Sequence, residues 1–392
     1  MTPKIVVVGC GVVGAMIAYE LSTRFNADIA VIESAQPAQG STGAALGVLM
    51  GIISHKVKGR TWRLREASIR RYPALISELA SIGHPVSYNS DGLISLCFDA
   101  GKLAKWETLR ETRQQQGWPL EIWSPVELQE RCPQVNLKNP QSEESVQAAI
   151  YSPTDSQVHP ADLTRSLVAA AQSQGVRVLT ETTVKRLILD QQRCVEVEIS
   201  HKSKTQILTA DWVILSAGLG SAQLASSAIS STGTTFKLMP VLGQAMKIQL
   251  PEQLGKDDFQ PVINGHDIHI VPLPNEPEKN CYWVGATVEF PPENIDWAHP
   301  NTILTAEEKG LENLQRGAIQ FMPAIAQASV LETWSGLRPR PVGQPAPVIQ
   351  PLNALTNVML ATGHYRNGVL LAPATAQQVC QWLEDEVPMA RR

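Results

Sequence analysis

The chain has 392 residues, of which 43% are hydrophobic and 18% charged, a balance typical of soluble globular proteins. Its net charge of −4 gives no general reason to expect nucleic acid or an anionic membrane as a partner. At about 150 residues per domain, the length favours two or three domains.

The sequence lacks the patterns of a membrane span, a signal peptide and a metal site. No apolar stretch approaches the roughly 20 residues of a membrane-spanning helix, and the N-terminus lacks the basic segment and cleavage site of a signal peptide. The six cysteines form no CxxC pair, and His266 and His269 alternate along a predicted strand without a third metal ligand. We therefore expect a cytoplasmic protein with reduced, buried thiols and no metal site.

The first segment of the chain carries its most specific local pattern. Residues 5–8 form a short apolar run, typical of a strand buried on both faces. Gly9, Gly11 and Gly14 follow at GxGxxG spacing, and apolar residues then recur at helical intervals. A second apolar run, residues 29–32, ends on Glu33.

Each part of this pattern has a role in a dinucleotide site. Gly9 permits a tight turn, Gly11 lets the backbone approach a pyrophosphate, and Gly14 allows close packing of helix on strand. The helix N-terminus offers N–H groups to phosphates. Glu33 lies 19 residues after Gly14, where a carboxylate can bind ribose hydroxyls. The acid disfavours NADP, so FAD and NAD remain as candidates.

Two neighbouring stretches are less specific. GSTGAALGVLM, residues 40–50, consists mostly of small side chains with the hydroxyl pair Ser41 and Thr42. Such a stretch lets a flat ligand lie against backbone, although it also fits a plain loop. Residues 56–71 hold seven basic side chains against one acid, which favours a solvated helix face over a docking surface.

The rest of the chain alternates between two kinds of pattern. Helices are predicted over residues 63–82, interrupted by Pro73, and over 160–174, and Ser124 with Glu127 suits the start of another. Strands are predicted at 92–98, 176–179, 184–189 and 212–217, and alternating antiparallel strands at 244–250, 267–273 and 281–290. The chain is thus expected to leave the nucleotide-binding domain and return to it twice.

Near the C-terminus, VMLATGHYRNGVLLAPATA (358–376) places a glycine-rich turn between an apolar run and a helix from about residue 369. With this segment in place, the chain resembles the D-amino acid oxidase family of FAD-dependent flavoproteins, and within it the glycine oxidases. The motifs that carry the likeness are the nucleotide pattern, GSTGAALGVLM, VHPADLTRSLVAAAQSQG, VILSAGLGS, PVLGQAMKI, YWVGATVE, WSGLRPRPV and GHYRNGVLLAP.

The resemblance implies a mixed α/β (α+β) fold of two interleaved domains. One is a Rossmann-like FAD-binding domain, and the other is a substrate domain with a large antiparallel sheet that covers the flavin. The predicted segments are 1–55, 145–230 and 330–392 for the FAD-binding domain, and 56–144 and 231–329 for the substrate domain.

The resemblance also implies an activity, the oxidative deamination of a small amino acid or amine such as glycine, sarcosine or a small D-amino acid. In this reaction hydride passes from the substrate to FAD, the imine product hydrolyses, and O2 reoxidises the flavin to give H2O2. The resemblance to glycine oxidases also implies a role in thiamine biosynthesis. The expected partners are the substrate and O2, without nucleic acid or membrane; a homo-oligomer is compatible with the sequence. Alternatives are a dehydrogenase that reduces a quinone or protein, an FAD module acting on a macromolecule, and an NAD-dependent dehydrogenase.

Site residues are carried over from the resemblance position by position. It assigns the substrate carboxylate to Arg338, makes Arg366 a second arginine of the site, and places His269 where glycine oxidases usually carry a tyrosine over the substrate. The implied cofactor residues are Gly9, Gly11, Gly14 and Glu33 at the phosphates and ribose, Ser41, Thr42, Ala44 and Ala45 beside the pyrophosphate and flavin, Val184 at the adenine, Gly218, and Gly363, Asn367, Gly368 and Val369 at the pyrimidine edge.

The chemistry is consistent with these residue types. FAD is the electron acceptor, and a planar guanidinium grips a carboxylate in two parallel hydrogen bonds, which favours arginine over lysine at residue 338. A helix N-terminus stabilises the negative charge of the reduced flavin. No cysteine lies between residues 282 and 379, where the sarcosine oxidase branch attaches its flavin, so we expect non-covalent FAD.

Overall fold

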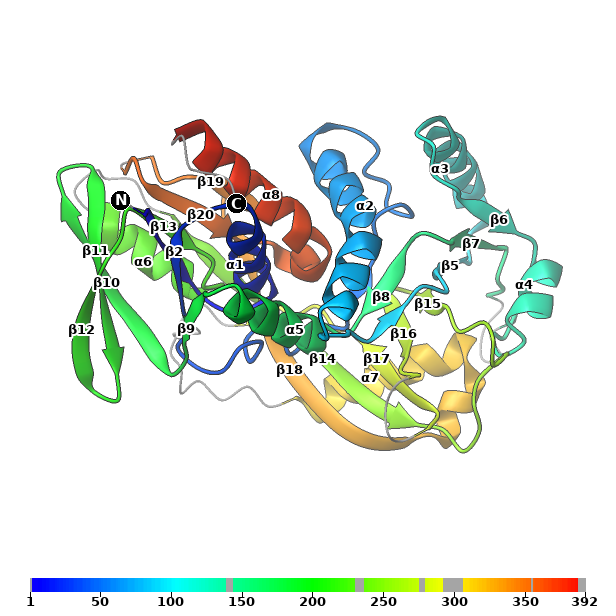
Figure 1. Ribbon diagram of the computed structural model, residues 1–392. Helices are drawn as coiled ribbons and strands as arrows, with labels where there is room; N and C mark the ends of the chain where they lie inside the picture. The colour runs from blue at the N-terminus through cyan, green and yellow to red at the C-terminus, as the bar shows by residue number, and fades with distance from the viewer. Residues whose placement is uncertain are drawn as a thin grey trace.

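Two large sheets organise the chain in the computed structural model, which describes residues 2–138, 144–229, 236–274, 279–291, 306–353 and 355–386 (Figure 1). The first sheet has six strands, and all neighbours are parallel except the edge pair β19 and β20. In spatial order they are β19 (Val348–Pro351), β20 (Val358–Thr362), β13 (Trp212–Leu215), β1 (Lys4–Val8), β2 (Asp28–Ile32) and β9 (Arg177–Leu179).

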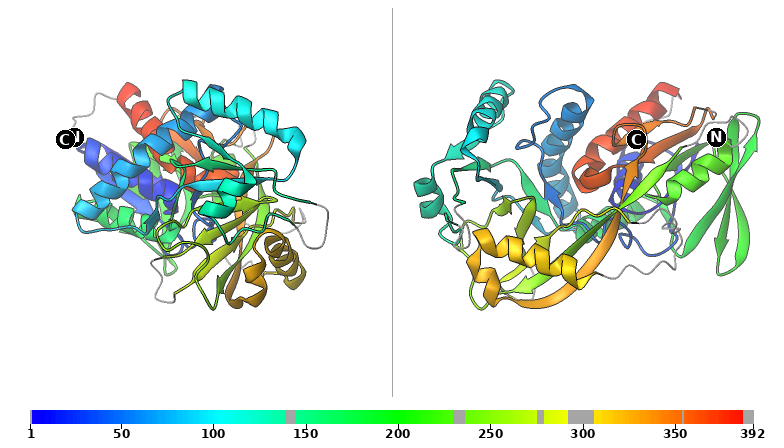
Figure 2. Two further views of the ribbon diagram at one scale, coloured as in Figure 1. Left: turned by 90° about the vertical axis from the view of Figure 1, so that its right-hand side faces the viewer. Right: turned by 180° about the vertical axis from the view of Figure 1, so that it is seen from behind.

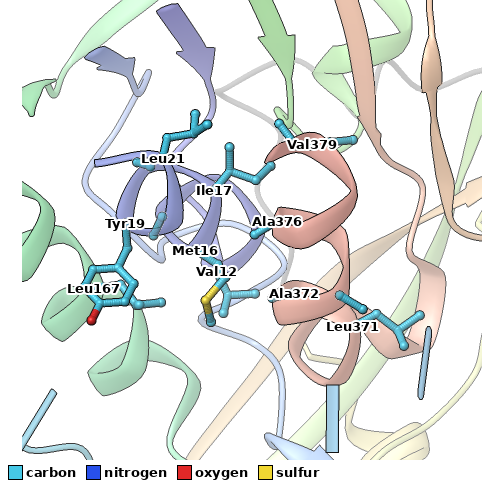
Figure 3. Close-up of a cluster of buried hydrophobic side chains, with 14 of the residues drawn as sticks. Val12, Met16, Ile17, Tyr19, Leu21, Leu167, Leu371, Ala372, Ala376 and Val379 are labelled. Carbon is cyan, nitrogen blue, oxygen red and sulfur yellow. The ribbon is translucent and has the colours of Figure 1, made fainter. Parts of the chain in front are cut away.

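This sheet is covered on both faces, which explains its continuous apolar strands. Successive side chains of a strand point to opposite faces, and Ile5 and Val7 pack on one cluster while Val6 and Val8 pack on another. Helices α1 (Val12–Arg24), α5 (Pro160–Ser173) and α8 (Gly368–Glu386) cover the first face. Figure 3 shows Ile17 of α1 facing Ala376 and Val379 of α8.

The opposite face meets a smaller layer. It consists of the antiparallel strands β10 (Thr182–Asp190), β11 (Arg193–His201) and β12 (Lys204–Thr209), with α6 (Gly220–Ile229) beside them. Val197 and Ile199 of β11 belong to the same buried cluster as Val6 and Val8. Strands β10–β12 and helix α6 therefore bury the second apolar face of the parallel strands.

The second large sheet has eight strands and is antiparallel except where β15 runs parallel to β5. Helices α4 (Pro125–Arg131) and α7 (Glu308–Phe321) pack on its outer face, and the right-hand view of Figure 2 shows α7 across its strands. In spatial order the strands are β18 (Ser329–Pro341), β14 (Leu238–Gln249), β17 (Cys281–Gly285), β16 (Ile268–Pro272), β15 (Val262–Gly265), β5 (Leu93–Cys97), β7 (Ala148–Ser152) and β6 (Glu121–Trp123).

Shorter elements connect these layers. Helix α2 packs against α8, and α3 begins after a short 3-10 turn. The remaining elements are β3 (Val48–Leu49), α2 (Gly59–Ser81), β4 (Tyr88–Asn89), η1 (Ala100–Lys102), α3 (Leu103–Gln115), β8 (Ser156–Val158), η3 (Pro323–Gln327) and η4 (Tyr365–Asn367).

The mixed α/β fold with a large antiparallel sheet is confirmed, as are several local predictions. Ser124 and Glu127 form a capping box at α4, and Pro160 lies in the first turn of α5. The strand predicted through His266 is wrong at that residue, which lies in the turn between β15 and β16 with a φ of 52°. The domain boundaries stay predictions; β7 and β18, expected in the FAD-binding segments, pair within the eight-stranded sheet.

Helix α2 stabilises the start of α8 through polar side chains on one face. Pro373 lies inside α8 and has no N–H, so the carbonyl of Val369, four residues earlier, lacks its helical donor. The buried hydroxyl of Tyr72 donates to this carbonyl at 2.5 Å, and Ser68 Oγ accepts from the N–H of Ala374 at 3.2 Å. Side chains of α2 therefore supplement the backbone hydrogen bonds in the first turns of α8.

Tyr72→Phe is expected to lower the free energy of unfolding by about 1–3 kcal/mol, because the carbonyl of Val369 becomes a buried acceptor without a donor. Urea unfolding at one FAD concentration measures this loss. In a Pro373→Ala background the helix supplies its own N–H, so the same substitution should cost less. Equal losses in both backgrounds would show that the Tyr72 hydroxyl does not compensate for the proline.

Candidate active site

The turn between β1 and α1 combines two glycines that pack against backbone with one, Gly11, whose near contact is a single side-chain oxygen. A Cβ on Gly9, whose φ is 98°, would lie 2.7 Å from Ala217 Cα, and a Cβ on Gly14 would lie 2.0 Å from the carbonyl oxygen of Gly9. Among the described residues, the one neighbour of such a Cβ at Gly11 is Thr42 Oγ1, at 3.0 Å. Backbone packing thus explains Gly9 and Gly14, whereas the approach of a pyrophosphate to Gly11 stays a prediction.

Two oxygen-bearing side chains meet this turn. Glu33 follows β2, and its carboxylate accepts from the N–H of Cys10 at 2.7 Å and of Ala35 at 3.0 Å. Thr42 Oγ1 accepts from the N–H of Val12 at 3.0 Å and so occupies the N-terminus of α1. The structure therefore brings Gly9, Gly11, Glu33 and Thr42 together, as a dinucleotide site requires.

The segment from Ser41 to Leu46 lies across the eight-stranded sheet. Ser41 Oγ donates to the carbonyl of Leu337 at 2.5 Å, and the indole N–H of Trp334 donates to the carbonyl of Ala44 at 3.2 Å. Its neighbour Ala45 is partly buried against the core of the first sheet. These contacts join the predicted flavin stretch to β18, which carries Arg338.

Glycines of the sheet make room for this segment, and the sequence patterns did not single them out. A Cβ on Gly336 would lie 2.2 Å from the Cβ of Ala44, and one on Gly285 would lie 2.9 Å from Leu46 Cδ1. A signal in the sequence could have found them: an isolated glycine within a strand pattern often marks a place where another segment approaches the backbone closely.

The C-terminal turn, residues 363–368, is held from two sides. Gly363 has a φ of 66°, and Thr362 Oγ1 donates to the carbonyl of Gly218 at 3.1 Å. Asn367 Oδ1 accepts from the guanidinium of Arg65 at 3.0 Å, just before Gly368 and Val369 begin α8. Gly218 and the turn therefore lie together at the C-terminal ends of β13 and β20.

Arg65 corrects the expectation of a solvated basic face at residues 56–71. It is buried, and besides Asn367 it donates to the carbonyl of Met50 at 2.6 Å. Arg71 of the same helix pairs with Glu20 and Glu78. Charge counting alone could not separate these inward-facing arginines from the exposed Arg63 and Arg70.

Val184, predicted at the adenine, lies on β10. It is partly buried against the cluster under the first sheet, next to a register irregularity between residues 184 and 186. The N–H of Thr182, two residues earlier, donates to the carbonyl of Glu33 at 2.8 Å. The start of β10 is thereby fixed beside the acid of the dinucleotide pattern.

Arg338 is fixed by backbone rather than by a carboxylate. It lies on β18 opposite Val241, and its Nη1 donates to the carbonyls of Leu242 and Thr287, both at 3.0 Å. Among the described residues no acidic side chain comes within ion-pair distance. Burial lowers the pKa of Arg338 from its ordinary value, and Arg366 lowers it further. Tyr365 and Glu289 act on this pKa in the opposite direction.

Electrostatics place His269 and Arg366 near one another and near Arg338. Burial, followed by the charge of Arg366, lowers the pKa of His269 to about 4, and Asp267 opposes this shift. Arg366 also acts on Arg338, and its own side chain is exposed. The charge of Arg366 thus acts on both other predicted residues. The assignment of the three to one substrate site stays a prediction.

The comparison with protein families identifies the family of this chain. Residues 4–382 match the family described as DAO, FAD dependent oxidoreductase. The chain belongs to this family. FAD is accordingly its cofactor. The residues present fit it: the turn at Gly11 and the N-terminus of α8 could each offer backbone N–H groups, to the phosphates and to the flavin respectively.

Relatives of this DAO-family chain carry related names. It is 28% identical over 391 residues to "Bifunctional protein ThiO/ThiG" of Trichormus variabilis, covering 98% of this chain and 53% of the relative. It is 26% identical over 384 residues to "Glycine oxidase" of Bacillus licheniformis, covering 96% and 92%. The chain therefore spans about half the length of the ThiO/ThiG relatives.

Solved structures show the same fold. Glycine oxidase from Geobacillus kaustophilus is 26% identical, with a TM-score of 0.81 over 99% of this chain and 97% of that one. L-proline dehydrogenase from P. horikoshii is 21% identical, with a TM-score of 0.80 over 98% and 94%. Both an oxidase and a dehydrogenase therefore share the architecture of this DAO-family chain.

The described residues also bear on a possible metal site, a membrane-spanning helix and the state of the thiols. Within the described ranges, no three His, Cys, Asp or Glu side chains are grouped to hold a metal ion. No helix in that part of the chain is long and apolar enough to cross a membrane. All six cysteines are buried and form no disulfide.

Gly243→Ala is expected to raise the KM for a carboxylate substrate about tenfold, because displacing a charge-assisted hydrogen bond typically costs 1.5–3 kcal/mol. An added Cβ would lie 2.1 Å from Nη2 and 2.3 Å from Cζ of Arg338, so the guanidinium must move. Steady-state kinetics with parallel measurement of FAD content tests this. An unchanged KM would show that Arg338 can adjust without leaving its binding position.

Proposed function

We propose that this chain oxidises a small amino acid to an imine by hydride transfer to FAD, and that glycine is the first substrate to test. The observation that carries the proposal is Arg338, a partly buried guanidinium held by two carbonyls on the sheet against which Ser41–Leu46 packs. Buried charges are normally paired. An anionic ligand is the natural partner of such a group, and a carboxylate matches its planar geometry.

In this proposal the side chains orient the substrate rather than exchange bonds with it. Arg338 binds the carboxylate in two parallel hydrogen bonds, and Arg366 adds a second positive charge. His269 is neutral at physiological pH because its pKa lies at about 4, so it does not repel an ammonium group. FAD accepts the hydride from the α-carbon, and holding that carbon in one orientation replaces a bimolecular encounter by a bound geometry.

The relatives support the substrate class. Several carry the name "Glycine oxidase" over almost their whole length. The ThiO/ThiG relatives contain the matched region within a longer bifunctional chain. We propose that this chain performs the ThiO role, which would place it in thiamine biosynthesis, and that it does so in the cytoplasm, where buried thiols stay reduced.

The electron acceptor defines a second candidate function. The fold is shared with an L-proline dehydrogenase, so a reaction that passes electrons to a quinone or protein remains the alternative to O2. In the oxidase reaction O2 takes up the electrons and H2O2 is released. We favour the oxidase because the relatives matched over nearly their whole length carry that name.

The experiment separates these functions in two steps. The purified protein should carry flavin absorbance, and anaerobic mixing with glycine, sarcosine, small D-amino acids and L-proline should bleach it for at least one. Air should then restore the colour and give one H2O2 per amine oxidised. Bleaching without peroxide in air, but with turnover of an artificial acceptor, would assign a dehydrogenase. No bleaching by any amine would overturn the proposal. Arg338→Ala is the matched control, and it should need far higher amine concentrations for the same bleaching.

A further inference from the structure

A β-bulge links the end of β17 to the guanidinium that is predicted to bind the substrate carboxylate. The pairs that flank it are Ala245 with Gly285 and Leu242 with Glu289. Between these pairs the segment after β17 has one more residue than β14, which is the pattern of a β-bulge. Thr287 lies within the bulge, and its carbonyl accepts from Arg338 Nη1 at 3.0 Å.

The side chain of Thr287 takes the place of a backbone acceptor in this bulge. The N–H of Gln244 donates to Thr287 Oγ1 at 2.9 Å, and the N–H of Thr287 donates to the carbonyl of Gln244 at 3.1 Å. A strand N–H needs an acceptor, and here the hydroxyl supplies it. The carbonyl of Thr287 is thereby left to accept from Arg338.

Glu289 fixes the direction of the Thr287 hydroxyl. Because Oγ1 accepts from a backbone N–H, its own proton is directed at Glu289 Oε1, 2.5 Å away. The same carboxylate oxygen accepts from Gln244 Nε2 at 2.8 Å. The orientation of this amide is fixed as well, because its Oε1 accepts from the backbone N–H of Glu307. We call Gln244, Thr287 and Glu289 the bulge network.

Part of the bulge network lies on the far side of the sheet from the guanidinium. Successive side chains of β14 point to opposite faces, and a Cβ on Gly243 would meet the guanidinium of Arg338. The next side chain, Gln244, is fully buried, and a Cβ on Gly310 of α7 would lie 2.5 Å from its Nε2. Helix α7 crosses the outer face of the sheet (Figure 2). The amide and the carboxylate bonded to it thus support the Thr287 carbonyl from behind.

We propose that the bulge network positions Arg338, because it holds the carbonyl of Thr287 in the place where the guanidinium donates to it. This role rests on the proposed amino acid oxidation and adds residues that set the affinity for its substrate without touching it. A guanidinium held in one orientation loses less freedom when a carboxylate binds. The bulge network therefore favours ligands that carry a carboxylate.

Thr287→Val tests this in the FAD-loaded enzyme, because valine has the shape of threonine without the hydroxyl. We expect the KM for the best amino acid to rise about tenfold, since the N–H of Gln244 and the carboxylate of Glu289 both lose a partner. The Kd for acetate should rise in parallel, whereas kcat and FAD content should change less than about twofold. Thr287→Ser keeps the hydroxyl and should restore the KM to within about threefold of wild type.

An Arg338→Ala background separates positioning from general structural damage. Without a guanidinium to position, Thr287→Val should change the KM less than about twofold, because the two substitutions act through one interaction. Damage to the sheet would instead raise the KM by the same factor in both backgrounds. Anaerobic flavin reduction over a range of substrate concentrations measures all four proteins.

A second variant disturbs the bulge network from α7. Gly310→Ala should displace the amide of Gln244, because the added Cβ would lie 2.5 Å from Nε2. We expect the KM to rise about threefold or more without loss of stability, since alanine favours the helix over glycine. Gly317→Ala on the same helix is the matched control. Its Cβ would meet the apolar side chain of Ile268 at 2.5 Å, and the KM should stay at the wild-type value.

An unchanged KM in Thr287→Val, or an increase that persists in the Arg338→Ala background, would overturn the positioning role alone. An equal increase in Thr287→Ser would do the same. If Thr287→Val does not fold, Gly310→Ala decides, and a KM no higher than that of Gly317→Ala would count against the bulge network. A wild type that no amino acid reduces would overturn the proposed function together with it.

Discussion

Arg338→Ala should raise the KM for the amino acid substrate about 100-fold or more, because truncating one partner of a buried charge pair typically costs 2–5 kcal/mol. The guanidinium is held by the carbonyls of Leu242 and Thr287 above Gly243, so its position is set before substrate arrives. FAD should remain bound because these contacts lie on β14 and the segment after β17, away from the glycine turn. Anaerobic flavin reduction over a range of substrate concentrations measures the effect.

Arg338→Lys is the matched control for charge. Lysine keeps the positive charge but loses the planar pair of donors, so most of the KM increase should persist. Acetate binding should weaken in parallel with the amino acid, because both ligands carry the carboxylate that Arg338 would bind. An unchanged KM in Arg338→Ala would mean that the carboxylate binds elsewhere.

Gly11→Ala should weaken FAD binding about 10- to 100-fold with little loss of stability in the FAD-free protein, since it displaces charge-assisted hydrogen bonds to phosphate. Among the described residues, a Cβ at this position would meet Thr42 Oγ1 at 3.0 Å, so the folded chain can accept it if the threonine side chain shifts slightly. A bound pyrophosphate in close contact with this backbone would have to move away from it. FAD titration of the apoprotein, together with its urea unfolding curve, measures both quantities.

Gly14→Ala provides the contrast. Its Cβ would lie 2.0 Å from the carbonyl oxygen of Gly9 and 2.7 Å from Ser216 Oγ, so α1 must move away from β1. We expect a stability loss of about 1–3 kcal/mol even without FAD, as for other overpacked sites. If Gly11→Ala destabilised the apoprotein as much as Gly14→Ala, the space at Gly11 would serve packing rather than a ligand.

Local patterns were sufficient for much of the fold. The apolar runs at β1 and β2, the glycine spacing between them, the capping box of α4 and the start of α5 all depend on residues close together in sequence. Their periodicity reports directly on burial. The order of the motifs then indicated the family and the mixed α/β fold, while the assigned site residues stay predictions that the variants above address.

Contacts between distant segments could not be inferred in this way. Three such contacts are the pairing of β18 with β14, the position of Gly243 beneath Arg338, and the hydrogen bond from Arg65 to Asn367. They join residues 80 to 302 positions apart. Helix and strand periodicity relates only residues that are close in sequence, so it says nothing about contacts at such separations. Local sequence patterns predicted the elements, and the order of the motifs, through the family resemblance, predicted FAD. The packing of the two sheets determines which arginines turn inward and that His269 lies opposite Asn264. These long-range contacts decide the character of the proposed substrate site.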